Sequence, residues 1–157
     1  MASVMRWRYG ETNPIMMPTS TDDVIEIGDT VWLDGDVARP ASELAKGSLS
    51  QGAFHDAFLG VTMQTSQLGS NEPIRIATSG VFEFDCDPAE FGIGQCIGPA
   101  NNQTSLPMAL QSQKVVEVNN PALAIGRCVK MVRPAASKVL VDIVSTIIRG
   151  GVQAAER

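Results

Sequence analysis

The chain has 157 residues, of which 44% are hydrophobic, with 14 Gly, 9 Pro and a formal net charge of −5. This length and apolar content predict one folded domain and exclude a disordered chain. The 12 Lys and Arg residues are scattered, and no run approaches the roughly 20 apolar residues that span a bilayer, so we expect neither nucleic acid nor a membrane as a partner.

The cellular compartment is predicted from the start of the chain and from the cysteines. No signal-peptide pattern follows Met1, so we expect the protein to be made and folded in a reducing cytosol. The cysteines agree, because they are odd in number and lack C-x-x-C spacing. We predict three inert core thiols: Cys86, Cys96 and Cys128.

Residues 1–21 are predicted to form an extended N-terminal arm. Pro14 and Pro18 disfavour helix, and the segment has no strand periodicity. Its apolar side chains need a surface to lie against, which is either the protein's own barrel or a partner. We expect an arm that is poorly ordered in the free protein, so that deleting residues 2–17 removes no strand. The arm residues predicted to contact a partner are Arg6, Trp7, Arg8, Tyr9, Ile15, Met16 and Met17.

A series of strand-like segments follows the arm and defines a domain over residues 22–145, with a tail at 146–157. Strands are expected at 24–27 and 30–33, on either side of the turn at Gly28. The turns between these segments are short, which favours antiparallel pairing.

Residues 38–56 are predicted to be irregular or helical, with about one turn of helix that ends at Gly47. Strand resumes at 58–63. Residues 73–86 form the clearest apolar run, and a hairpin or a kinked strand fits it equally well.

Residues 98–114 are rich in Gly, Pro, Asn, Gln and Ser, which predicts a long loop. Further strands are expected at 115–118, 129–132 and 139–144. About eight short strands with turn signals between them predict an all-β fold. The expected architecture is a small antiparallel β-barrel or β-sandwich with at most one or two short helices.

A five-residue phrase recurs at 27–31, 93–97 and 125–129, and each copy is apolar, Gly, polar, small and β-branched in that order. The Gly allows a turn with positive φ, after which a strand can begin. The copies are too irregularly spaced for a solenoid or a propeller.

The sequence carries little catalytic chemistry. His55 stands beside Asp56, but neighbours on a strand face opposite sides and no nucleophile elbow is present, so we expect an exposed loop histidine. The spacing of Gly92, Gly94 and Gly98 is one residue too long for a dinucleotide fingerprint. We predict no enzymatic activity and no cofactor, and we assign no metal site.

Three carboxylates, Glu83, Asp85 and Asp87, share one face of a predicted strand because they are two residues apart. Three interpretations stay open: the solvated face of an amphipathic strand, a set of hard oxygen ligands for Ca²⁺, and an acidic docking surface for a basic partner. We include Glu83 and Asp85 among the predicted interface residues.

The order of the motifs resembles that of the small capsid decoration (cement) proteins of tailed bacteriophages. In that family a G-D-x-V opening, a G-V strand, a V-x-V-x-x-x-G-V-F central run, an I-G turn and a V-x-V/I ending follow one another. The matching segments here are 27–31, 58–61, 74–82, 125–128 and 139–143, within residues 24–144.

The resemblance implies a structural protein without a catalytic site that binds the outer surface of an icosahedral phage head. Its expected partners are the major capsid protein, whose subunit contacts it would stabilise, and further copies of itself in a homotrimer. The expected location is the outer surface of the capsid in the virion. The long arm and residues 38–56 and 98–114 depart from the family pattern, which leaves the docking geometry and the oligomeric state open.

Two other classes of function remain open. A β-barrel module that binds a small ligand or peptide without catalysis would be a monomer with an apolar pocket. An enzyme of unrecognised chemistry would need polar residues converging from several strands, and the sequence does not show them.

Overall fold

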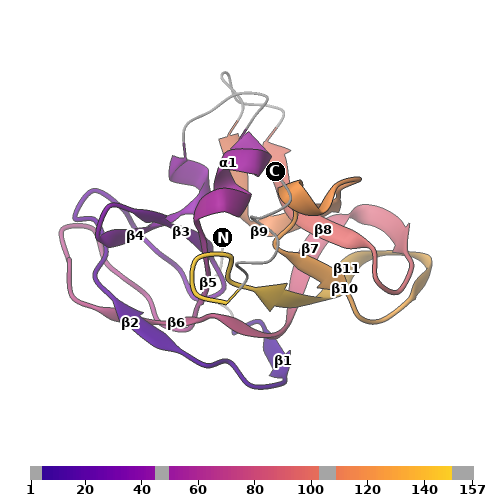
Figure 1. Cartoon of the computed structure of the whole chain (residues 1–157), viewed down its shortest axis with the longest axis horizontal. Helices are drawn as coiled ribbons and strands as arrows, with labels where there is room; N and C mark the ends of the chain where they lie inside the picture. The colour runs from indigo at the N-terminus through magenta and orange to yellow at the C-terminus, as the bar shows by residue number, and fades with distance from the viewer. Residues whose placement is uncertain (1–4, 45–49, 103–108, 150–157) are drawn as a thin grey trace.

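The structure, a computed structural model, describes residues 5–44, 50–102 and 109–149 (Figure 1). Within these ranges one α-helix occurs, α1 (Ser50–Ala57), with two short 3-10 segments, η1 (Ala41–Glu43) and η2 (Pro121–Leu123), and none is long and apolar enough to cross a membrane. The strands are β1 (Trp7–Tyr9), β2 (Ile15–Met17), β3 (Thr30–Asp34), β4 (Val37–Pro40), β5 (Phe58–Thr62), β6 (Ile74–Ala77), β7 (Ser79–Phe91), β8 (Cys96–Asn102), β9 (Ala109–Glu117), β10 (Gly126–Cys128) and β11 (Val132–Val144). The predicted all-β class is confirmed.

Five strands close into a barrel in the order β7-β11-β10-β8-β9, with β9 returning to β7. Neighbouring strands are antiparallel except β9 and β7, whose parallel contact is a single bridge between Asp85 and Lys114. The two longest strands of the barrel, β7 and β11, pair with each other along their length (Figure 1). β1 pairs with β7 beside the barrel.

A second antiparallel sheet has the order β2-β6-β5-β3-β4. β6 belongs to this sheet and β7 to the barrel, although only Thr78 separates them along the chain. Residues 73–86 are therefore a kinked strand that crosses between the sheets, which was one of the two predicted forms.

The buried apolar side chains form two cores, and the larger one extends from the barrel onto the second sheet through Phe58, Val61 and Ala77. The larger core contains Phe58, Phe82, Phe84, Ile97, Val141 and Ile143, and α1 adds Phe54 to it. The second core lies in the five-stranded sheet and contains Ile25, Val31, Leu59, Ile74 and Ile76. Apolar side chains alternate with polar ones along β7, as the sequence predicts for a strand with one buried face.

The prediction of an arm without strands is wrong. β1 pairs with β7 through Trp7 and Tyr9, and β2 pairs with β6. Both strands are three residues long, which is too short for an alternating pattern to show in the sequence. Of the two surfaces considered for residues 1–21, the described part lies against the protein's own sheets, so deleting residues 2–17 would remove two strands.

Four other predicted segments differ from the structure. The strand expected at 129–132 does not form, because β10 ends at Cys128 and β11 begins at Val132. Residues 38–56, predicted to be irregular or helical with a helical turn that ends at Gly47, include most of β4, and the α-helix begins only at Ser50.

Residues 24–27 form no strand, and Ile25 makes only an isolated bridge with Ser66. The predicted loop at 98–114 is largely β8 and β9, while residues 103–108 lie outside the described part of the chain. The Gly and Pro content of this segment predicted a loop, but Gly98 and Pro99 are accommodated within the β8–β9 ladder.

The recurring phrase has two structural roles. Gly28 and Gly94 adopt positive φ values of 96° and 86° in turns that precede β3 and β8, as predicted. Gly126 instead lies inside β10, where a Cβ atom would stand 2.2 Å from the carbonyl oxygen of Asp142. The third glycine therefore permits close approach of β10 to β11 rather than a turn.

We expect Gly126→Ala to lower the free energy of unfolding by about 2–3 kcal/mol, because the added methyl overpacks two paired strands. Gly92→Ala is the matched control, since the nearest atom to its Cβ lies 4.0 Å away, and it should change stability by less than about 0.5 kcal/mol. Urea denaturation of both variants measures the difference, and equal stabilities would contradict the account.

Candidate functional site

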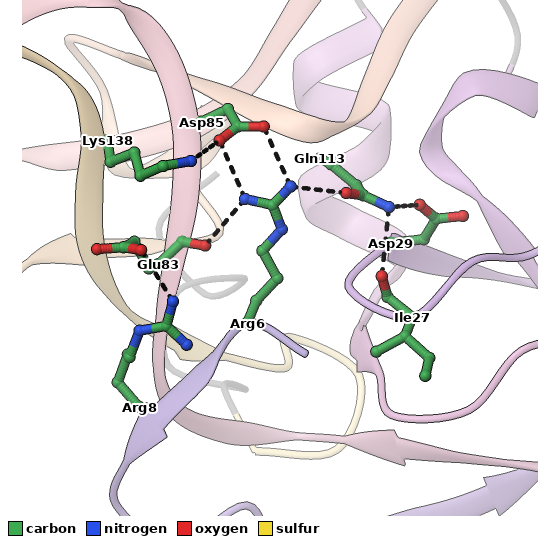
Figure 2. Close-up of polar contacts among 8 residues, drawn as sticks. All are labelled: Arg6, Arg8, Ile27, Asp29, Glu83, Asp85, Gln113 and Lys138. Carbon is green, nitrogen blue, oxygen red and sulfur yellow. Dashed lines mark hydrogen bonds and ion pairs between the residues drawn. The ribbon is translucent and has the colours of Figure 1, made fainter. Parts of the chain in front are cut away.

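Arg6, which immediately precedes β1, is buried at the junction of the two sheets (Figure 2). Its guanidinium donates to both carboxylate oxygens of Asp85 at 3.1 Å each, and to Oε1 of Gln113 at 2.8 Å. Planar bidentate pairing of this kind fixes orientation as well as charge. Arg6 therefore joins the N-terminal segment to β7 and to β9.

Gln113 extends the network to the second sheet. Its Nε2 donates to Oδ1 of Asp29 at 2.8 Å and to the carbonyl oxygen of Ile27 at 3.3 Å (Figure 2). Burial raises the pKa of Asp29, and the hydrogen bond from Gln113 opposes this shift. The chain of contacts from Arg6 to Asp29, which we call the junction network, links the barrel to the segment that leads into β3.

Every carboxylate of the predicted acidic row has a cationic partner within the chain. The ion pairs are Glu83 with Arg8 at 2.9 Å, Asp85 with Arg6 at 3.1 Å and with Lys138 at 2.6 Å, and Asp87 with Lys114 at 2.6 Å. The hydrogen bond from Arg6 is the largest cause that lowers the pKa of Asp85 to about 2. Among the described residues no group of three or more His, Cys, Asp or Glu side chains could hold a metal ion. The row is thus largely neutralised by this chain's own cations.

The apolar side chains of the N-terminal segment divide into two sets. Ile15 and Met17 pack against the core of the second sheet. Four others are exposed, with accessible fractions of 41% for Met5, 39% for Trp7, 52% for Tyr9 and 56% for Met16, and we call them the apolar edge. Trp7 and Tyr9 lie on β1, Met5 precedes it, and Met16 lies on β2. Both strands run along the lower border of the molecule in Figure 1.

The indole of Trp7 shows how this edge is held. Its Nε1 donates to the carbonyl oxygen of Gly10 at 2.9 Å, so the polar atom is satisfied locally while the ring remains accessible. A partner could then cover the ring without leaving a polar atom unpaired. Whether Trp7, Tyr9 and Met16 contact a partner stays a prediction.

His55 is not the exposed loop residue that the sequence predicted. It lies in α1, is 2% exposed, and its Nδ1 is 2.7 Å from the carbonyl oxygen of Ala124. Because a carbonyl only accepts, Nδ1 carries the proton. The backbone carbonyl of His55 also accepts a hydrogen bond from the Thr146 hydroxyl, so this histidine ties α1 to the segment before β10 and to the segment after β11.

A cavity of about 340 Å³ lies beside His55, with Ile93, Ile125 and Asp142 in its walls. The ligand-binding alternative requires an apolar pocket, whereas Arg127, Asp142 and Thr146 also line this cavity. The Nε2 atom of His55 is fully buried and has no hydrogen-bond partner within the described part of the chain, so it offers a ligand no accessible polar atom. Burial also raises the pKa of Asp142.

The cysteines are free, as predicted. Cys86 and Cys128 are buried and Cys96 is half-buried. Burial raises the pKa of the Cys86 thiol, which disfavours the reactive thiolate.

Sequence reasoning missed Gln113 and Asp29. Gln113 fell in a segment predicted to be a loop, and its partner Asp29 is 84 residues away along the chain. No local pattern marks such a pair, because it depends on how two sheets meet. No protein-family model, curated protein or solved structure matches this chain.

We expect Arg6→Met to lower the free energy of unfolding by about 2–3 kcal/mol, because it leaves Gln113 and Asp85 without their shared donor. Arg8→Met is the matched control, since its ion pair with Glu83 is exposed and should contribute less than about 1 kcal/mol. Urea unfolding distinguishes them, and a loss at Arg6 no larger than that at Arg8 would show that the junction network is not a stabilising feature.

The junction network also predicts a dependence on pH. Asp85 contributes stability above its ordinary pKa of 3.8, and this contribution disappears as the pH falls through its folded value of about 2. Asp29 acts with the opposite sign, since its pKa is raised and protonation favours the folded state.

Comparison of the native chain with Asp85→Asn isolates the first effect. The difference in unfolding free energy between the two proteins should be largest above about pH 5 and should shrink steadily towards about pH 2. Denaturant unfolding at a series of pH values measures it. A difference that stays constant over this window would contradict the assignment.

Proposed function

We propose that this protein is a decoration protein without catalytic activity that binds the outer surface of an icosahedral phage head and stabilises contacts between major capsid protein subunits. The observation that carries the proposal is the apolar edge. Its two aromatic side chains, Trp7 and Tyr9, are exposed two residues apart on β1, and aromatic side chains contribute much of the binding energy of interfaces. The order of the sequence motifs supplies the identity of the partner.

The pairing of β1 with β7 holds the aromatic side chains of the apolar edge in place, which favours binding to a rigid capsid surface. Trp7 and Tyr9 stand on a strand paired to β7, and Arg6 beside them is anchored in the junction network. A preordered surface loses little conformational entropy on binding, so more of its contact energy appears as affinity. An edge that bridges a subunit boundary would resist the outward pressure of packaged DNA.

The charges of the described residues support a protein partner rather than nucleic acid. Of the ten described Lys and Arg residues, five form ion pairs with carboxylates of this chain, namely Arg6, Arg8, Arg39, Lys114 and Lys138. The remaining net charge is negative. Phosphate binding needs accessible cations, and an acidic surface keeps the protein away from DNA before assembly.

We further propose that the protein associates as a homotrimer, as the resemblance implies. Exposed apolar side chains away from the apolar edge, including Leu68, Ile93 and Met131, provide additional surface for contacts between copies. Sedimentation equilibrium at micromolar concentration should give the mass of three chains. A mass of one chain, both free and when bound to heads, would exclude the trimer.

We expect the double variant Trp7→Ala, Tyr9→Ala to bind heads at least about tenfold more weakly, a loss of about 1.4 kcal/mol, because both exposed rings are removed. Both side chains are exposed, so the fold should persist. Binding is measured by co-sedimentation with expanded heads assembled from the major capsid protein encoded in the same genome.

Val24→Ala is the matched control, because Val24 is as accessible as Tyr9, at 52%, but lies outside the apolar edge. It should bind as the native chain does. Equal affinities for the double variant and the control would exclude the apolar edge as the contact surface, and absence of binding by the native chain would overturn the proposed function.

A further inference from the structure

The barrel has an open seam between β7 and β9. The ladder that joins these strands is the single bridge from Asp85 to Lys114, and the two strands form no further pair beyond it. A hollow of about 710 Å³ lies between the second half of β7 and the β8–β9 pair. Its floor consists of buried apolar side chains, namely Cys86, Phe91, Val115 and Val118.

The backbone of β9 presents hydrogen-bonding groups to this seam. The carbonyl oxygen of Ile97 on β8 accepts from the amide of Ile125 at 2.8 Å, so the polar backbone groups of Ile97 point towards β10. Glu117 is the residue opposite Ile97 on β9. In an antiparallel ladder such a pair exchanges no hydrogen bonds, so the N–H and C=O of Glu117 point away from β8.

The backbone of Val118, the residue after Glu117, points in the opposite direction. The amide of Val118 donates to the carbonyl oxygen of Cys96 on β8 at 2.9 Å. Val118 therefore faces β8, and Glu117 faces the seam. An unpaired strand edge of this kind is a template for another extended chain.

Charge identifies what kind of chain would fit. The carboxylates of Asp87 and Glu117 stand in the wall of the hollow, and the Asp87 side chain is 86% exposed. One ammonium, that of Lys114, lies within 2.6 Å of Asp87, while Glu117 accepts a hydrogen bond from the neutral amide of Gln95. The wall keeps a net negative charge above an apolar floor.

We propose that the seam binds an extended segment of a partner protein by strand addition along β9. The segment pairs its backbone with Glu117, inserts an apolar side chain over Val115 and Phe91, and places a Lys or Arg beside the two carboxylates. This inference rests on the proposed function only for the identity of the partner, which is then a segment of the major capsid protein.

Glu117→Pro tests the backbone contact directly. Proline removes the N–H that faces the seam and removes no hydrogen bond of the β8–β9 ladder. Glu117→Ala is the matched control, because it removes the carboxylate and keeps the N–H. We expect Glu117→Pro to weaken binding to heads at least about tenfold and Glu117→Ala to weaken it less than about fivefold. Circular dichroism checks that both variants fold.

Hydrogen exchange on the native chain provides a readout that needs no variant. The amide of Glu117 should exchange rapidly in the free protein and become protected when heads bind, whereas the amide of Val118 should be protected in both states. If heads bind and the Glu117 amide stays unprotected, or if folded Glu117→Pro binds as tightly as the native chain, the seam is not the site.

A model peptide separates this inference from the proposed function. If the native chain fails to bind heads, the hexapeptide Lys-Val-Lys-Val-Lys-Val, blocked at both ends, is added at millimolar concentration in its place. Protection of the Glu117 amide by this peptide, and its absence with the Glu-for-Lys counterpart, supports the seam while the phage assignment falls. No protection by the peptide would overturn the inference. Protection that instead rises with protein concentration alone would identify a second copy of this chain as the occupant and would contradict the proposal.

Discussion

The bidentate pair between Arg6 and Asp85 is the contact on which the arrangement of the molecule depends. Taking a guanidinium out of water is costly unless its donors find acceptors. Here Asp85 and Gln113 accept hydrogen bonds from its two terminal nitrogens, whereas the buried Nε has no partner among the described residues. The same Gln113 reaches Asp29 beside the second sheet. A hydrophobic contact would tolerate sliding of one sheet over the other, whereas this network is satisfied in one geometry. It therefore fixes where the N-terminal segment lies and which of its side chains face outwards.

β7 connects the features that matter for binding. It pairs with β1 along one part of its length, meets β9 at Asp85, and borders the open seam beyond that bridge. The apolar edge and the seam thus lie beside successive parts of β7, and the junction network lies between them. A partner that engaged both would bind across the region where the two sheets are joined.

The sequence predicted the elements whose pattern is local and missed those that depend on contacts between distant residues. The alternation along residues 79–86 placed Glu83 and Asp85 on one face of a strand, and the structure agrees. It did not reveal that Arg6, 79 residues before Asp85, is the partner of that carboxylate. Ion pairing between neighbouring strands is fixed by the register of β1 on β7, which leaves no mark in a single sequence.

Short or buried elements were misjudged for related reasons. The sequence predicted an exposed His55 because the side chain is polar. A polar side chain can be buried where it finds a hydrogen-bond acceptor, and here the carbonyl oxygen of Ala124 is that acceptor. β1 and β2 were invisible because three residues carry no period.

We propose that the apolar edge, held by the junction network, is the surface that meets the capsid. A cryo-electron microscopy reconstruction of expanded heads saturated with this protein tests it most directly. We expect density in which Trp7 and Tyr9 are covered by capsid subunits on both sides of a subunit boundary. A reconstruction in which β1 and β2 face solvent, with the protein bound through another surface, would contradict it.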